Sequence, residues 1–220
     1  MKIAILGESE ADEAAFKVLA EAVLGGPLDL LEKPSLQSRG WPAVMKAVEA
    51  AIKHLYYHTE AEGFVFVVDS NHSTPHEPAH NYSTDGDNGC RLCQIRRAVH
   101  KAKRSLRPIH SRQPLKTAVG LAVPSIEAWL QCGVNPAVTE AAWINGIKSK
   151  TEPYTKLQLK QNVYGTNRPS LPLETKRMLE EATRLGKQIS TLENLFPLGF
   201  GAFSDDIRGW RVLNSETSYT

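Results

Sequence analysis

The apolar run from Gly63 to Val68 breaks off abruptly at the polar triplet Asp69-Ser70-Asn71. Its consecutive Phe and Val residues predict a strand that is buried on both faces, as in a parallel sheet covered by helices. The acid that follows such a strand lies at the edge of the sheet. Ligands of open α/β sheets bind beyond the carboxyl ends of the strands, so Asp69 and Asn71 are candidate site residues.

Strand and helix patterns alternate through the first part of the chain. Strands are expected at 3–6, 28–32, 63–68 and 117–123, and helices at 14–24, 42–57, 90–106 and after 124. This order predicts a three-layer α/β fold with a mainly parallel, four-stranded, Rossmann-like sheet. We therefore divide the chain into an α/β domain, 1–134, and a C-terminal α-helical extension, 135–220, packed on it. Six aromatic residues are expected to form the core between them: Trp129, Trp143, Phe196, Phe200, Phe203 and Trp210.

The composition of the chain says more about the cellular compartment of the protein than about its function. The 220 residues carry a net charge of +2 with both signs intermixed, so any basic surface must be local. Three cysteines, an odd number, favour a reducing compartment over a disulfide scaffold. The opening residues lack the pattern of a signal peptide and no apolar run reaches the length of a membrane span, so we expect a cytoplasmic protein that does not enter the membrane.

Acids follow three of the predicted strands. Glu8 comes after the first, Asp69 after the third and Glu127 just past the fourth. In a parallel sheet these ends share one edge, where gathered carboxylates repel each other unless a cation neutralises them. Oxygen ligands favour a hard ion, Mg²⁺ or Mn²⁺. The alternative is that these acids only stabilise helix N-termini or turns.

These residues also carry a family resemblance. The motifs are Glu8-x-x-x-Asp12, Val68-Asp-Ser-Asn71, Val123-Pro-Ser-Ile-Glu-Ala-Trp-Leu130 and Phe196-Pro-Leu-Gly-Phe200. Together they resemble the TOPRIM domain of topoisomerases, primases and overcoming-lysogenization-defect nucleases, and are similar to a group of small stand-alone bacterial TOPRIM-like proteins. That group is expected to work beside an ATPase in anti-phage defence.

The resemblance implies a role for each matching position. Glu8 matches a glutamate assigned to metal binding or to general acid–base work, and Asp69 matches the first aspartate of an Asp-x-Asp pair, a metal ligand. Asn71 replaces the second aspartate and offers an oxygen without a charge, which weakens the case for a second metal. Glu127 lies outside the minimal motif and is included because the Glu-Ala-Trp-Leu stretch recurs in the stand-alone group.

Two functions are therefore expected. The first is a Mg²⁺- or Mn²⁺-dependent nuclease that hydrolyses DNA or RNA with Glu8 and Asp69 as catalytic residues, because no tyrosine is placed as a topoisomerase nucleophile. The second is a non-catalytic, TOPRIM-like binding or regulatory subunit of an ATPase complex, which the uncharged Asn71 favours.

The expected helix at 90–106 is the most basic part of the chain. Arg97, Lys101 and Arg104 are spaced to share one helical face and could contact a phosphate backbone, or could simply form a solvated surface. Cys90-x-x-Cys93 at its start raises the alternative of structural zinc. Zinc ribbons usually supply two such pairs, or one pair and two histidines at helical spacing, so here the preceding loop would have to fold back to add ligands. The favoured interpretation is a solvated loop with ordinary thiols. Its neighbouring histidines are His72, His76, His80 and His100.

Overall fold

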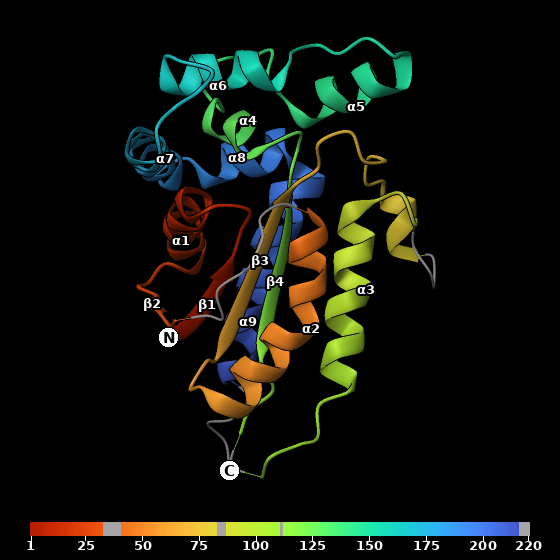
Figure 1. The fold of residues 1–220 in the computed structure, drawn as a ribbon, viewed down its shortest axis with the longest axis vertical. Coiled ribbons are helices and arrows are strands. Elements are labelled where there is room, and N and C mark those ends of the chain that lie inside the picture. Colours follow the sequence, from red (N-terminus) through yellow and green to blue (C-terminus); the bar gives the residue numbers. More distant parts are fainter. Residues whose placement is uncertain (33–40, 83–86, 111, 216–220) are drawn as a thin grey trace.

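The structure, a computed structural model, describes residues 1–32, 41–82, 87–110 and 112–215, with side chains to residue 211. Its centre is a four-stranded sheet of β1 (Lys2–Leu6), β2 (Asp29–Leu30), β3 (Gly63–Asp69) and β4 (Lys116–Ala122). The strands are parallel and lie in the order β2-β1-β3-β4 (Figure 1). The predicted α/β fold with a parallel sheet is confirmed, although β2 is only two residues long.

The register of the strands decides which residues meet at the carboxyl edge. Leu6, the last residue of β1, pairs with Phe66, and Asp69, the last residue of β3, pairs with Ala122 of β4. The central strand β3 is buried on both faces up to Asp69, as its apolar run predicts. The residues that follow β1, β3 and β4 consequently leave the sheet on the same side.

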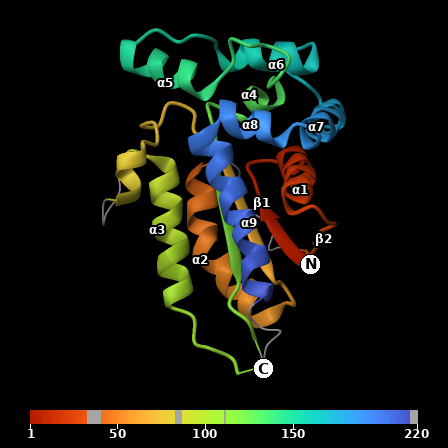
Figure 2. The ribbon, with the colours of Figure 1, turned by 180° about the vertical axis from the view of Figure 1, so that it is seen from behind.

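Helices cover both faces of this sheet. Helices α2 (Trp41–His58) and α3 (Arg91–Arg104) lie on one face (Figure 1), and α1 (Glu10–Leu24) and α9 (Ala202–Ser215) lie on the other (Figure 2). Helix α1 begins where the Ser9 hydroxyl accepts the backbone N–H of Asp12. It ends at Gly25, whose φ of 70° is the left-handed conformation that glycine adopts most readily.

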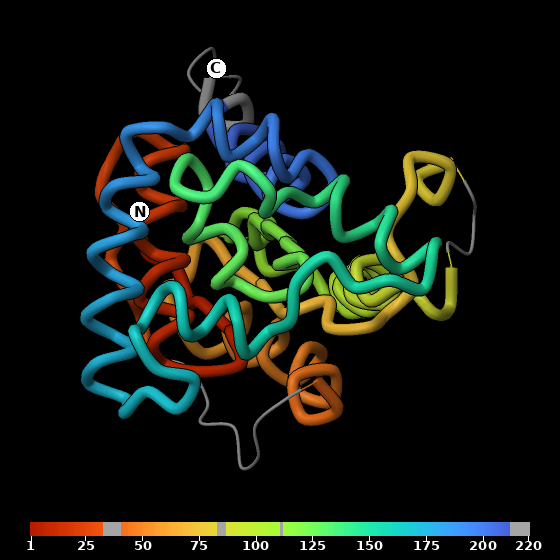
Figure 3. The backbone as a smooth tube through the Cα atoms, turned by 90° about the horizontal axis from the view of Figure 1, so that it is seen from above, coloured from red at the N-terminus to blue at the C-terminus, as the bar shows by residue number. Residues whose placement is uncertain are grey.

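The remaining helices form a roof over the carboxyl edge. They are α4 (Ile126–Leu130), α5 (Glu140–Ser149), α6 (Lys156–Tyr164), α7 (Leu171–Gly186) and α8 (Ile189–Leu195). Seen from above, α5 and α6 cross over the ends of the strands, and α7 lies beside α1 (Figure 3). The loop before α3 contains a short 3₁₀ helix, η1 (Pro78–Tyr82). Among the described residues, no helix is long and apolar enough to cross a membrane.

The second half of the chain shares one hydrophobic core with the sheet. The six aromatic residues assigned to the core are all at most 3 % exposed and belong to the same cluster as the strands. The division at residue 134 stays a prediction. Helix α8 and the π-helical turn η2 (Pro197–Gly201) were not expected, because Pro197 interrupts a short apolar run. In η2 a Cβ on Gly199 would lie 2.2 Å from the Leu121 carbonyl oxygen, so only glycine fits there.

Candidate functional site

The carboxyl edge gathers the acids that the sequence placed at strand ends. We call Glu8, Asp12, Asp69 and Glu127 the acidic rim. An oxygen of Glu8 accepts the backbone N–H of Asp69 at 3.1 Å, so the ends of β1 and β3 are in direct contact. The Asp69 carboxylate in turn accepts the N–H of Ile126, the first residue of α4, at 3.2 Å. The Glu8 side chain therefore reaches the backbone of a residue 61 positions later in the chain, at one edge of the sheet.

A lysine from the roof already pairs with this edge. The ammonium group of Lys156, at the start of α6, lies 2.6 Å from Asp69 Oδ2 and 2.6 Å from Asn71 Oδ1. Asn71 has a φ of 49°, a left-handed conformation that asparagine tolerates better than most residues, and this turns its amide toward Lys156. Lys156 thus bridges two of the four side chains that the sequence assigned to a metal.

Glu127 has partners of its own on α6. It is 3 % exposed, accepts the Tyr164 hydroxyl at 3.3 Å and lies 3.5 Å from the Lys160 ammonium group. Lys160 also lies 3.8 Å from Glu174 of α7. Glu127 therefore belongs to a partly buried ionic network between α4, α6 and α7, and its charge also acts on Asp69.

A second cation reaches the rim from the face of the sheet that α2 and α3 cover. The guanidinium group of Arg91, at the start of α3, donates to the Asp69 carbonyl at 2.5 Å and lies 4.0 Å from Glu8. It also stacks 4.8 Å from the ring centre of Trp41, which fixes its position. Arg91 and Lys156 therefore approach the same pair of acids from two layers of the fold.

Burial controls the electrostatics of the rim. The pKa of Asp69 is raised to about 7, mainly by burial and further by Glu127 and Glu8, while Lys156 opposes the rise. Burial, followed by the charges of Asp69 and Glu127, also raises the pKa of Asp12 well above its usual range. For Lys156 burial lowers the pKa, but the charge and hydrogen bond of Asp69 outweigh it, so the net pKa is raised and the amine stays protonated. The rim is a crowded set of acids that is stabilised by added positive charge.

The side chains at the rim fit a hard ion in part. Glu8 contacts the backbone of Asp69, and Mg²⁺ often needs only one or two carboxylates together with water. Lys156 lies on the oxygens of Asp69 and Asn71 that an ion would use, so its amine must move for both to become ligands. The buried hydroxyl of Ser125, two residues before Glu127, has no hydrogen-bond partner in the described part of the chain and offers a further oxygen at this end of the sheet.

A helix was expected from the sequence at 155–163, close to α6, but its contact with the acidic rim was not. Lys156, Lys160 and Tyr164 recur every four residues, so they share one face of α6, and this face meets the acidic rim. The spacing is visible in the sequence. The contact of this face with the acidic rim is not visible in the sequence, because it depends on the path that the chain takes across the roof.

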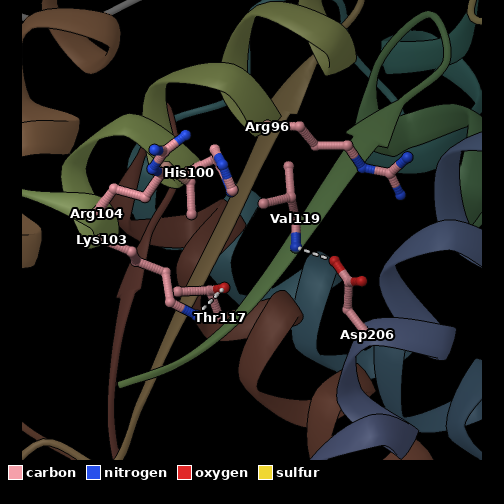
Figure 4. A pocket seen from close by; sticks show the side chains of 8 residues that line it. Arg96, His100, Lys103, Arg104, Thr117, Val119 and Asp206 are labelled. Carbon is pink, nitrogen blue, oxygen red and sulfur yellow. Dashed lines mark hydrogen bonds between the residues drawn. The ribbon is translucent and has the colours of Figure 1, made fainter. Parts of the chain in front are cut away.

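The basic face predicted on α3 is divided between two surroundings. Arg104 lines an open cleft of about 450 Å³ between α3, β4 and α9, together with Arg96, His100 and Lys103 (Figure 4). Lys101 is exposed and acts on Glu49 of α2, whose pKa is lowered mainly by Lys53 and more weakly by Lys101. Arg97 is half-buried and engaged in contacts of its own. The cleft therefore holds one member of the predicted triplet, Arg104, and the acid Asp206 also lines it.

The interpretation of the histidine loop as solvated is wrong for His76, which is buried. His76, Cys90 and Cys93 are buried, His80 is half-buried, and their ligand atoms lie within 4.8 Å of one another. The loop folds back onto the start of α3, which a count of cysteine pairs did not reveal. His72 instead lies 3.5 Å from Glu152, and His100 lines the cleft. Residues 83–86 of the loop lie outside the described residues.

The fold and this edge define a class: a parallel three-layer α/β protein with acids and cations gathered beyond the carboxyl ends of its strands. Comparisons with protein-family models, with curated proteins and with solved structures found no match to the chain. The TOPRIM resemblance consequently rests on the motifs quoted from the sequence.

Proposed function

We propose that the acidic rim is the active site of a TOPRIM-like, Mg²⁺- or Mn²⁺-dependent phosphodiesterase, a nuclease that acts on DNA or RNA. The contact between Glu8 and the backbone of Asp69 carries the proposal. It joins acids from two neighbouring parallel strands at the edge where α/β proteins bind their ligands. The raised pKa of Asp69 supports it, since perturbed acids are common in functional sites.

Each group at the rim has a part in this reaction. Glu8 and Asp69 would hold the ion, joined by the amide oxygen of Asn71 once Lys156 withdraws. A bound ion would polarise the scissile phosphate and lower the pKa of an attacking water. Lys156 and Arg91 place two permanent cations beside the same acids, where they can bind and orient the phosphate oxygens of the substrate. Glu127 supports Lys160 and Tyr164 and touches no reacting atom.

The substrate backbone would lie along α3. Arg91 begins this helix at the rim, and Arg104, at its last residue, lines the basic cleft. Phosphate contacts from such side chains position a nucleic acid without reading its sequence. We place this activity in the cytoplasm, beside an ATPase partner in an anti-phage system, on the strength of the resemblance, and three free, buried cysteines agree with a reducing compartment.

Nuclease assays with Mg²⁺ or Mn²⁺ on single- and double-stranded DNA and RNA test this function. We expect Glu8→Ala and Asp69→Ala to abolish metal-dependent cleavage. Glu10→Ala is the matched control, because Glu10 is an exposed acid in the first turn of α1, two residues from Glu8. Circular dichroism should show that all three variants are folded. Cleavage that survives both rim substitutions would overturn the proposal.

A second function is favoured by Lys156. Its ammonium group already neutralises Asp69 and bonds Asn71, so the rim can be complete without a metal. The protein would then be a non-catalytic TOPRIM-like binding or regulatory subunit of an ATPase complex. Calorimetric titration separates the two functions. A catalytic rim gives Mg²⁺ or Mn²⁺ binding heat that disappears in Asp69→Asn, whereas a binding subunit gives no such heat in the wild type.

A further inference from the structure

Four side chains from the loop after β3 and the start of α3 face a common point. We call His76, His80, Cys90 and Cys93 the thiol–imidazole cluster. Cys90 Sγ lies 3.5 Å from His76 Nδ1, and Cys93 Sγ lies 3.6 Å from the same nitrogen and 3.7 Å from His80 Nδ1. Around one tetrahedral zinc ion, Zn–S and Zn–N bonds of about 2.3 and 2.1 Å separate sulfur from nitrogen by about 3.6 Å. All three separations agree with that value.

The local sequence brings these ligands together in two pairs. Cys90 is the N-terminal capping residue of α3 and Cys93 follows one turn later, so both thiols point the same way. His76 and His80 stand on either side of the start of η1, and their rings pack edge to face with centres 5.3 Å apart. Two ligands from a helix and two from a loop make a closed, four-ligand set, as structural zinc sites have.

The hydrogen bonds around the cluster leave one histidine nitrogen ready to bind a metal. His76 Nε2 lies 3.2 Å from Asn81 Oδ1, an oxygen that can only accept, so the ring proton is on Nε2 and the lone pair of Nδ1 faces the thiols. Arg96 donates to the same oxygen at 3.0 Å and fixes it. At His80, Nδ1 lies 3.4 Å from the Glu77 N–H, a long contact that a metal bond would replace.

The loop itself is pinned close to the ligands. Asp87 Oδ1 accepts the backbone N–H groups of Gly89 and Cys90 at 2.6 and 2.9 Å. A Cβ on Gly89 would lie 2.3 Å from the Thr74 hydroxyl, so the two arms of the loop approach closely only because residue 89 is glycine. Apart from its ends the loop is mainly polar, so it has little apolar surface of its own to hold this shape.

We propose that the thiol–imidazole cluster is a structural Zn²⁺ site. Two cysteines and two histidines in tetrahedral arrangement suit this borderline-soft ion and exclude the oxygen-seeking Mg²⁺ of the rim. All four positions are filled by protein, so the ion closes the loop onto α3 rather than activating water. This loop begins at Ser70 and Asn71, so the zinc would also fix the side of the rim that carries Asn71.

Metal analysis tests the zinc site without any activity assay. Its result is therefore independent of whether the proposed nuclease activity exists. The full chain is expressed with added zinc, purified without chelators and analysed by inductively coupled plasma mass spectrometry. We expect about one zinc per chain in the wild type. Cys93→Ser and His76→Ala should lose it. Cys132→Ser and His72→Ala are matched controls that should keep it, because these residues lie outside the cluster.

Two further measurements decide the case if a variant fails to fold. Cobalt added to the zinc-depleted wild type should give the ligand-field bands of a tetrahedral ion and a thiolate charge-transfer band. Asn81→Ala, which keeps all four ligands, should bind zinc about 10- to 100-fold more weakly in competition with a chromophoric chelator. A folded wild type that takes up no zinc and shows no tetrahedral cobalt bands, or that carries a Cys90–Cys93 disulfide by mass spectrometry, would overturn the site.

Discussion

The acidic rim and the thiol–imidazole cluster lie at the two ends of one loop and solve the problem of buried polar groups differently. At the rim, Glu8 and Asp69 are hard ligands, and the cations Lys156 and Arg91 already accompany them. In the cluster, sulfur and nitrogen atoms face one another at the spacing of metal ligands. The first region balances its charge with its own side chains, and the second has a geometry that an added ion would complete.

This difference shows which structural feature is better evidence for a permanently bound metal ion. Charge alone is ambiguous, because a lysine can neutralise carboxylates as a metal does. Convergence of several ligand atoms on one point is more specific, since side chains give up rotational freedom to reach it. The rim therefore suits an ion that comes and goes with substrate, and the cluster suits one that stays.

Removing zinc should have the largest effect. A strong chelator is expected to lower the stability of the wild type by about 4 kcal/mol, well below the roughly 10–16 kcal/mol available in zinc-finger peptides, because the sheet has a core of its own. That corresponds to a fall in Tm of about 10 °C by calorimetry. The chelator should lower the Tm of Cys132→Ser by the same amount, and it should leave the Tm of Cys93→Ser unchanged. A wild type whose Tm ignores the chelator would remove the contrast between the two regions.

The next largest effect is expected at Glu140, a buried acid outside the rim. Its carboxylate accepts backbone N–H groups, whereas the rim acids are paired with cations. Glu140 of α5 is 2 % exposed and accepts the Leu198 N–H at 2.7 Å, and burial raises its pKa to about 7. A raised pKa favours the folded state at low pH, and this contribution is lost as the pH rises from about 4.5 to 7. We expect wild-type stability to fall by roughly 2 to 3 kcal/mol relative to Glu140→Gln over that window.

Urea unfolding of both proteins at a series of pH values measures this change. Glu193→Gln, which removes a carboxylate that is paired with Arg208, is the comparison variant. Parallel pH profiles for wild type and Glu140→Gln would show that the pKa of this carboxyl is the same in the folded and the unfolded protein, which contradicts the prediction.

Lys156→Met should have a smaller effect that depends on the metal. Removing the amine leaves the oxygens of Asp69 and Asn71 short of a partner, which we expect to lower stability by about 2 kcal/mol in the presence of EDTA. If the rim binds Mg²⁺, millimolar Mg²⁺ should restore most of the loss, because the ion replaces the missing charge. Thermal unfolding with and without Mg²⁺ gives the answer. A loss that Mg²⁺ leaves untouched supports the binding subunit over the nuclease.

The smallest effect concerns α3, the helix that links the two regions. Arg104→Ala removes one basic side chain from the cleft and should weaken nucleic-acid binding by about 1 kcal/mol and lower the slope of log K against log salt by about one. Lys176→Ala, an exposed lysine of α7 on a different surface, is the control. Fluorescence anisotropy at several salt concentrations measures both. Equal slopes for Arg104→Ala and wild type would place the substrate elsewhere.

The contact between Glu8 and Asp69 was predictable because it follows from topology. Two buried runs that each end in an acid, joined by helices, make parallel strands, and parallel strands end on the same edge. The aromatic core was predictable for a similar reason, since large apolar side chains are buried wherever the chain places them. Short-range patterns are sufficient for such features.

The positions of Lys156 and of the thiol–imidazole cluster depend instead on which distant segments of the chain pack against each other. Lys156 lies 87 residues after Asp69, and no local pattern states that α6 crosses the strand ends. His76 and His80 were visible as residues, but their burial depends on a polar loop folding back onto α3. Counting cysteine pairs missed the site because histidines supply the second pair. Tertiary closure, rather than propensity, decides both cases.

The Lys156 bridge has a consequence for how the rim would meet an ion. A divalent metal arriving there does not fill an open position; it competes with an amine tethered to the same oxygens. Metal binding would then replace the single positive charge of the Lys156 ammonium group with the double charge of the ion. The apparent affinity of the rim for the metal would be weak until a substrate phosphate binds the released ammonium group. Metal and substrate would consequently bind together more tightly than either does alone.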